Sequence, residues 1–365
     1  MAEKTKKSFF ETGLMRSRIK SRTVSLFPEA GLGYLLGPIL ALLGNGVINI
    51  WLIQYWDKVL GLGTWAPLVE TLIPIFSSII IVAGNILVGR LMERKPSLAG
   101  KARPLILLGM PIILVSMLVL FLVPFPGAAD EAKTLAGGSM EGGVLASIFM
   151  AVGYNLYYAF AWPLYYTSHS ALVNLSTRDG GKRGLLGTAI MAAQLAAAGV
   201  SGMAGGILVE LLGLMPKYRY TEKFLATYKD KLGDITFTND FKDILNNKIA
   251  GRQLIEIKDE LLRETGDYVT EITRAQANQK WTILMIAMIA ALVVGCLLEY
   301  FFTRERITEE NIKNAEASNE AENKGPKKVK MGEQIRICMK DKYWWMLMIF
   351  WFLYQFGGMM KNNDM

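Results

Sequence analysis

The sequence predicts an all-α protein that crosses a membrane repeatedly, with six spans and then, after a long connecting segment, a seventh. Two observations predict this class. Hydrophobic residues make up 52% of the 365-residue chain, and they recur in uninterrupted runs that are long enough to cross a bilayer. Lysine and arginine gather in alternate connections between these runs, and this is the pattern that orients membrane helices.

The predicted elements follow one another in a simple order along the chain. A basic tail occupies residues 1–31, spans I to V lie within 32–214, span VI covers 281–302, and span VII lies within 342–365. Each span is justified by an apolar run bounded by charged, Gly or Pro residues. The individual runs of spans I to V are 33–55, 65–88, 105–123, 143–172 and 185–214.

The distribution of positive charge predicts an N-terminus in the cytoplasm. The tail and the connections 90–103 and 176–183 are rich in lysine and arginine, whereas the two intervening short connections carry Lys58 and Lys133 alone. Short basic loops remain on the cytoplasmic side, so we expect a multi-pass protein of the cytoplasmic membrane with the lipid bilayer as its surroundings. The same topology accounts for the net charge of +8 without a nucleic-acid partner.

Two longer segments interrupt the spans. Residues 215–280 mix charged and apolar side chains, and we expect them to form a partly helical extracytoplasmic cap. Residues 303–341 are rich in Glu, Asn and Lys, which favours a flexible cytoplasmic linker. Because the span within 342–365 has no partner after it, the chain reads as the first part of a longer protein, with the missing C-terminal half as a possible partner.

The sequence offers little material for enzyme chemistry. His169 is the only histidine, and the two cysteines, Cys296 and Cys338, make neither a disulfide framework nor a metal set. No nucleophile–base pair or phosphate-binding loop is recognisable. We therefore predict no enzyme, no catalytic residue, no metal and no cofactor. Glu210 and Glu299, near the ends of their spans, are expected to extend to the membrane interface.

Neutral polar and aromatic residues are the best candidates for a binding site in the spans. Asn45 and Asn49 share one face of span I, and on span IV a stripe at steps of three and four begins at Asn155 and ends at His169. Aromatic rings and amide groups suit a sugar, but membrane helices use the same residues to pack together. For His169 a proton-relay role stays open. The substrate candidates are Asn45, Asn49, Tyr158, Trp162, Tyr166 and Gln194.

Three motifs resemble one family of transporters. The run ALVNLSTRDGGKR from Ala171 to Arg183 resembles the span IV–V loop of the glycoside–pentoside–hexuronide:cation symporters, the melibiose permease group. Gly89, followed by GKARP from Gly100, resembles their span II–III loop, and YWDKVLGL from Tyr55 resembles the turn after span I. The resemblance covers most of residues 33–200. It implies a major facilitator-type six-helix half-bundle plus one further helix.

The charged site of that family is missing here. When the two sequences are aligned on the span II–III loop, Ile81 and Asn85 stand where the sodium-coupled members carry two aspartates. Asn85 is therefore a candidate remnant of a cation site, or a residue that packs helices together. Ala41, Tyr166 and Met191 stand at other charged positions of the family site. We therefore expect transport, if it is coupled to a cation, to depend weakly on Na⁺ or to use H⁺.

The resemblance implies a secondary active transporter that carries a sugar or glycoside across the cytoplasmic membrane by alternating access. It also favours a cytoplasmic gate formed by Arg103, Asp179 and Arg183, although the charges of these residues serve topology as well. Two alternatives remain. One is a transporter of an amphiphilic or lipid-like solute, which the missing carboxylates would suit. The other is a truncated membrane protein that does not transport.

Overall fold

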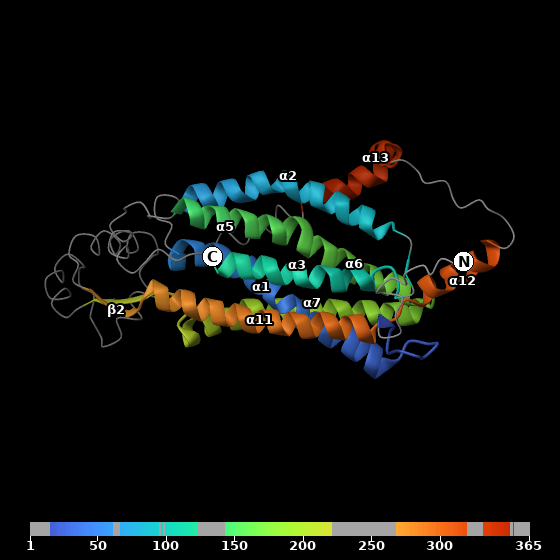
Figure 1. The fold of residues 1–365 in the computed structure, drawn as a ribbon, viewed down its shortest axis with the longest axis horizontal. Coiled ribbons are helices and arrows are strands. Elements are labelled where there is room, and N and C mark those ends of the chain that lie inside the picture. Colours follow the sequence, from blue (N-terminus) through green and yellow to red (C-terminus); the bar gives the residue numbers. More distant parts are fainter. Residues whose placement is uncertain are drawn as a thin grey trace, which may run out of the picture. The chain divides into compact units, whose positions relative to one another are not determined.

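The structure, a computed structural model, shows a bundle of long apolar helices (Figure 1). Nearly all of its regular structure is helical, which confirms the predicted all-α, polytopic membrane class. Contact clustering divides the chain into two units, residues 1–312 and 313–365, and each is described by itself. The described residues are 15–60, 66–94, 96–97, 99–122, 143–220, 268–319, 331–350 and 353.

The first unit contains every helix of the bundle. Among the described residues, five helices are long and apolar enough to cross a membrane, namely Leu26–Gln54, Thr71–Met92, Arg103–Phe121, Gly180–Gly202 and Arg274–Phe302. The elements that contain them are η3 (Leu26–Leu36), α1 (Gly37–Gln54), η4 (Tyr55–Leu60), α2 (Ala66–Met92), α3 (Arg103–Phe121), α7 (Gly180–Leu212) and α11 (Arg274–Phe302).

The predicted span IV is present as three helical segments in direct succession. These are α5 (Gly143–Asn155), the π-helix η7 (Leu156–Ala161) and α6 (Trp162–Ser176). Pro163 is the second residue of α6, where it lacks an N–H group and its ring crowds the carbonyl four residues earlier. The N–H of Trp162 therefore bonds five residues back, to Tyr157, and this widened turn is the π-helix.

The first span is longer than the sequence predicts, because its helix begins at Leu26 with η3. Pro38, the second residue of α1, has the same local effect as Pro163, since the Gly37 N–H bonds to the Leu32 carbonyl, five residues earlier. Part of the expected basic tail is also anchored to the end of α11. The Ser17 hydroxyl donates to the Thr303 carbonyl at 2.7 Å.

Close helix contacts hold the bundle together. Alpha-helix α1 packs against α11 and α7, and α3 packs against α11, α5 and α6, so these helices run side by side in Figure 1. At Gly295 of α11 a Cβ atom would lie 2.5 Å from the Gly37 carbonyl oxygen and the Ala41 nitrogen, which shows how closely the two backbones approach. Small residues permit such crossings in membrane helices.

The expected cap 215–280 is described only at its two ends. There β1 (Lys217–Tyr220) and β2 (Tyr268–Ile272) pair as a short antiparallel ladder, and residues 221–267 lie outside the described residues. Helix α11 begins at Arg274, earlier than predicted. Thr273 and Gln276 form a capping box, which satisfies backbone N–H groups at this end of the helix.

The expected linker 303–341 contains two helices in its described part, and its flexibility stays a prediction. Helix α12 (Arg306–Asn319) spans the boundary between the units, and α13 (Met331–Lys340) lies within the second unit. The many Glu, Lys and Ala residues that suggested disorder are also good helix formers. A helix follows over 342–350, and the remainder of the predicted span VII, apart from residue 353, lies outside the described residues.

Candidate functional site

The predicted stripe of rings exists and begins on the π-helix. Tyr157 and Tyr158 are consecutive, yet both reach α1, because a π turn holds more residues and rotates successive side chains less. The Tyr157 hydroxyl donates to Asn45 Oδ1 and the Tyr158 hydroxyl to Asn49 Oδ1, each at 2.8 Å. Two amides predicted to face substrate are therefore joined to the stripe by hydrogen bonds.

The stripe continues along α6 towards His169. The rings of Tyr157 and Trp162 are stacked with centroids 6.2 Å apart, and those of Trp162 and Tyr166 are stacked at 5.2 Å. Tyr166 then contacts the His169 ring at 6.3 Å. Tyr166 is 40% exposed, whereas Tyr165 beside it is 1% exposed. One face of α6 thus offers an aromatic surface, and the other enters the core.

The other predicted site residues lie apart from this stripe. Gln194 is half-buried on α7, and none of the hydrogen bonds among the described residues joins it to the stripe. Asn85 is exposed on α2, and its amide donates to the Ile81 carbonyl of the same helix at 2.9 Å. Its part in cation binding stays a prediction.

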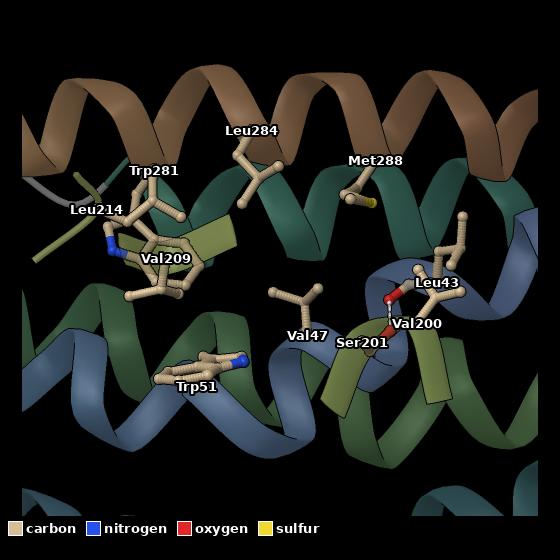
Figure 2. Close-up of a pocket in the computed structure, with 10 residues that line it drawn as sticks. All are labelled: Leu43, Val47, Trp51, Val200, Ser201, Val209, Leu214, Trp281, Leu284 and Met288. Atoms are coloured by element: carbon tan, nitrogen blue, oxygen red, sulfur yellow. Dashed lines mark hydrogen bonds between the residues drawn. The ribbon is translucent and has the colours of Figure 1, made fainter. Parts of the chain in front are cut away.

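An apolar pocket lies between α1, α7 and α11 (Figure 2). The Ser201 hydroxyl in its wall donates to the Leu43 carbonyl at 3.0 Å, and the indole N–H groups of Trp51 and Trp281 are buried without a hydrogen-bond partner. Sequence reasoning did not find this pocket, because its lining is ordinary membrane-helix composition. The lining residues are Leu43, Val47, Trp51, Val200, Ser201, Val209, Leu214, Trp281, Leu284 and Met288.

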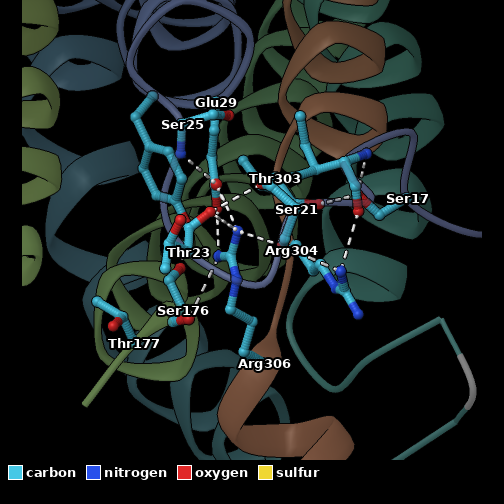
Figure 3. Close-up of polar contacts among 12 residues, drawn as sticks. Ser17, Ser21, Thr23, Ser25, Glu29, Ser176, Thr177, Thr303, Arg304 and Arg306 are labelled. Carbon is cyan, nitrogen blue, oxygen red and sulfur yellow. Dashed lines mark hydrogen bonds and ion pairs between the residues drawn. The ribbon is translucent and has the colours of Figure 1, made fainter. Parts of the chain in front are cut away.

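Charged side chains gather at the end of the bundle opposite the β-ladder (Figure 1). This end carries the loops at residues 97–103 and 177–179, and we call it the loop end. Figure 3 shows that Arg306 reaches Glu29, and its two terminal guanidinium nitrogens, Nη1 and Nη2, each lie 2.7 Å from a carboxylate oxygen of Glu29. Arg304 donates to backbone carbonyls of residues 19–21 and to Glu309, whose carboxylate raises the pKa of Arg304 above its usual value. These contacts attach the chain before span I, and the first turn of its helix, to the chain after span VI.

The three predicted gate residues all lie at the loop end, where each has local partners. Arg103 is buried and donates to the carbonyls of Ala99 and Tyr300 at 2.8 Å. Asp179 caps α7 by accepting from the backbone N–H groups of residues 181 and 182, and Arg183 donates to the Thr177 carbonyl. The described hydrogen bonds do not join the three to one another, and their gating role stays a prediction.

The motif glycine at the start of α3 has a structural reason. Gly100 has a φ of +114°, a conformation that other residues rarely adopt, and a Cβ atom there would collide with the Glu305 carboxylate. That carboxylate accepts from the backbone N–H groups of Lys101, Ala102 and Arg103. The glycine thus lets a side chain from beyond span VI cap the first turn of α3.

Glu299 does not reach the membrane interface, contrary to expectation. It is fully buried, with one oxygen 2.6 Å from His169 Nδ1 and the other accepting from the Tyr165 hydroxyl at 2.9 Å. Its position three residues before the end of an apolar run suggested an exposed charge. The pairing joins residues 130 positions apart in the sequence, and local patterns carry no signal for such a contact.

Comparison with known families decides the identity. The family described as MFS/sugar transport protein matches residues 33–364. The chain belongs to this family. It is therefore a multi-pass membrane transporter of the major facilitator type, as the motifs at Tyr55, Gly89 and Ala171 predicted. A comparison with curated proteins found no match.

The exposure difference on α6 gives a direct test of the stripe's orientation. In a Cys338→Ser background, we expect Tyr166→Cys to react with a water-soluble thiol reagent at least about tenfold faster than Tyr165→Cys, because only position 166 is exposed. The native Cys296 is buried and adds little background. Equal, slow labelling at both positions would mean that the stripe does not face water.

Proposed function

We propose that this transporter carries a sugar or glycoside by alternating access, with the substrate held against the aromatic stripe of α6. The observation that supports this most directly is the stacked pair Trp162 and Tyr166, of which Tyr166 is 40% exposed. Aromatic faces stack on the C–H faces of sugar rings, and neutral amides and hydroxyls bond sugar hydroxyls. Asn49 and Tyr158 supply such groups one to two turns away.

The neutral character of this region matters for the choice of substrate class. Before its last residue, His169, the stripe carries hydroxyl, amide and indole groups, and Asn85 stands where the related symporters have a carboxylate. A neutral site suits an uncharged, hydroxyl-rich solute, because no buried charge has to be compensated. Coupling to a cation, if present, then falls to groups outside the span II positions.

A second candidate substrate is an amphiphilic solute with an apolar chain. The pocket of Figure 2 favours it, since its lining is almost wholly apolar and two buried indole N–H groups are unpartnered. A polar acceptor on the solute would pair with an indole N–H group.

Uptake by purified protein in proteoliposomes tests the proposal. We expect labelled disaccharide to enter and labelled lysolipid not to be moved. Trp162→Ala should lower disaccharide uptake at low substrate concentration about tenfold, because it removes a stacking surface worth about 1–1.5 kcal/mol. Trp162→Phe keeps a ring and should retain most uptake.

The exposed Ile283→Ala on α11 is the matched control and should transport as the unchanged chain does. Movement of lysolipid but not disaccharide would favour the amphiphile instead. A Trp162→Ala protein that unfolds at the usual temperature and transports normally would remove the stripe from the substrate path.

A further inference from the structure

A buried ionisable pair lies inside the first unit, near the last turn of α11. His169 on α6 and Glu299 on α11 are both fully buried, and the bond between them joins two helices that otherwise pack mainly against α3 and α1. Tyr165 donates to the second carboxylate oxygen, so both oxygens of Glu299 are satisfied. Ionisable groups inside membrane helices are costly, and they commonly mark proton or ion paths.

The histidine of the pair has one nitrogen in use and one free. Nδ1 lies 2.6 Å from the carboxylate, whereas Nε2 is buried and has no hydrogen-bond partner. A buried nitrogen without a partner is unusual and calls for a reason. Addition of a proton to Nε2 forms one N–H bond and makes the ring a cation, while Glu299 remains its anion. The pair can therefore hold one extra proton without leaving an uncompensated charge.

The other titratable groups around the pair do not supply a second counter-charge for the extra proton. Tyr165 and Tyr166 lie against the His169 ring, Cys296 lies one turn before Glu299, and Tyr34 on η3 lies within electrostatic reach of the carboxylate. In the described ion pairs, His169 is the sole charged partner of Glu299. The neighbouring charged groups have other partners, namely Glu29 with Arg306, Glu305 with backbone N–H groups, and Arg103 with backbone carbonyls.

The position of the pair connects it to both the stripe and the loop end. On one side, the His169 ring contacts Tyr166, which stacks on Trp162. On the other side, the Tyr34 hydroxyl bonds to the Ser176 hydroxyl and to the Leu172 carbonyl, one turn nearer the loop end. The pair therefore lies between the proposed substrate surface and the loop end, and a proton bound there would sit on His169 next to that surface.

We propose that the His169–Glu299 pair is a proton-binding site and that its loading by H⁺ drives transport. This deepens the proposed function and rests on it for the coupling, whereas the site itself stands on the geometry of the pair. The site supplies the coupling ion that the neutral span II positions do not hold. The proton comes from water at one membrane face and returns to water at the other.

The single histidine makes the site directly measurable. The full chain, labelled with ¹⁵N-histidine and placed in lipid nanodiscs, gives nitrogen signals from His169 alone. We expect the signal of a second N–H group, at Nε2, to grow as the solution is acidified, because the proposed site takes up H⁺ there. At one fixed pH at which the unchanged chain shows this signal, Glu299→Gln should weaken it at least about threefold, because the anion that compensates the ring cation is lost.

Two variants keep this test informative. Glu210→Gln removes an exposed carboxylate of α7 and should leave the Nε2–H signal unchanged. If Glu299→Gln does not fold, Tyr165→Phe deletes only one hydrogen bond to the carboxylate and should still change that signal. A histidine that never gains the second N–H signal, or a signal that neither variant changes, would overturn the proton site.

Transport measurements then test the coupling. With labelled disaccharide in proteoliposomes, an imposed pH gradient should drive accumulation by the unchanged chain. His169→Asn should lose this accumulation at least about tenfold while it retains exchange of substrate without a gradient. Full gradient-driven accumulation by His169→Asn would refute the coupling. If the unchanged chain moves neither disaccharide nor lysolipid, the proposed function and the coupling fail, and the nitrogen titration still decides the proton site.

Discussion

Replacement of Arg306 by alanine is expected to lower the free energy of unfolding by about 3–5 kcal/mol. Glu29 is fully buried and receives two hydrogen bonds from Arg306, which is itself only 10% exposed, and one from the Ser25 backbone N–H. Removal of the arginine leaves a buried carboxylate without a cation, and this costs far more than the pair contributes when intact. The measurement is equilibrium unfolding in detergent micelles, followed by tryptophan fluorescence.

The chain offers a matched control for this change. Arg178 pairs with Glu310 at 3.1 Å, but the two side chains are 67% and 55% exposed. Arg178→Ala should change the free energy of unfolding by less than about 1 kcal/mol, because water replaces the lost partner. The double variant Glu29→Ala/Arg306→Ala should recover part of the loss. Equal effects of Arg306→Ala and Arg178→Ala would show that the Glu29 carboxylate is not buried in the folded protein.

The Glu29–Arg306 pair also shows where sequence reasoning stops. The spans were predictable because each is an apolar run longer than a bilayer, and the helices at 103–121 and 180–212 begin and end close to the predicted bounds. Glu29 lay in a segment that read as a polar tail. Its partner is 277 residues away, so the burial of this charge depends on a contact that no local pattern encodes.

In the candidate site, too, some features could be predicted from the sequence and others could not. The aromatic stripe was predictable from one helix, since Tyr158, Trp162 and Tyr166 recur at helical spacing, and the structure shows them on one continuous run of ring contacts. The π-helix was not predicted, although Pro163 was its signal. The His169–Glu299 bond depends on how α6 and α11 pack against their neighbours, and spacing along either helix alone does not indicate it.

The second large loss in the free energy of unfolding is expected on replacement of Glu305, whose carboxylate caps the first turn of α3. Its carboxylate is 1% exposed and accepts three backbone N–H groups at 2.7–2.9 Å as well as the Thr308 hydroxyl at 2.8 Å. Glu305→Ala should lower the free energy of unfolding by about 3 kcal/mol, because it leaves buried donors unsatisfied and removes a negative charge from a helix N-terminus.

Asp179 provides the comparison that separates capping from burial. It also caps a helix with its carboxylate, accepting from the backbone N–H groups of residues 181 and 182, but it is exposed to solvent. Asp179→Ala should therefore cost about 1 kcal/mol, the usual value for a lost cap. If both replacements cost the same, Glu305 contributes as an ordinary cap. A cost near threefold larger at Glu305, measured in the same detergent, means that burial makes this residue the link between the 97–103 loop and the end of span VI. The 97–103 loop and the end of span VI would then move together when the transporter changes state.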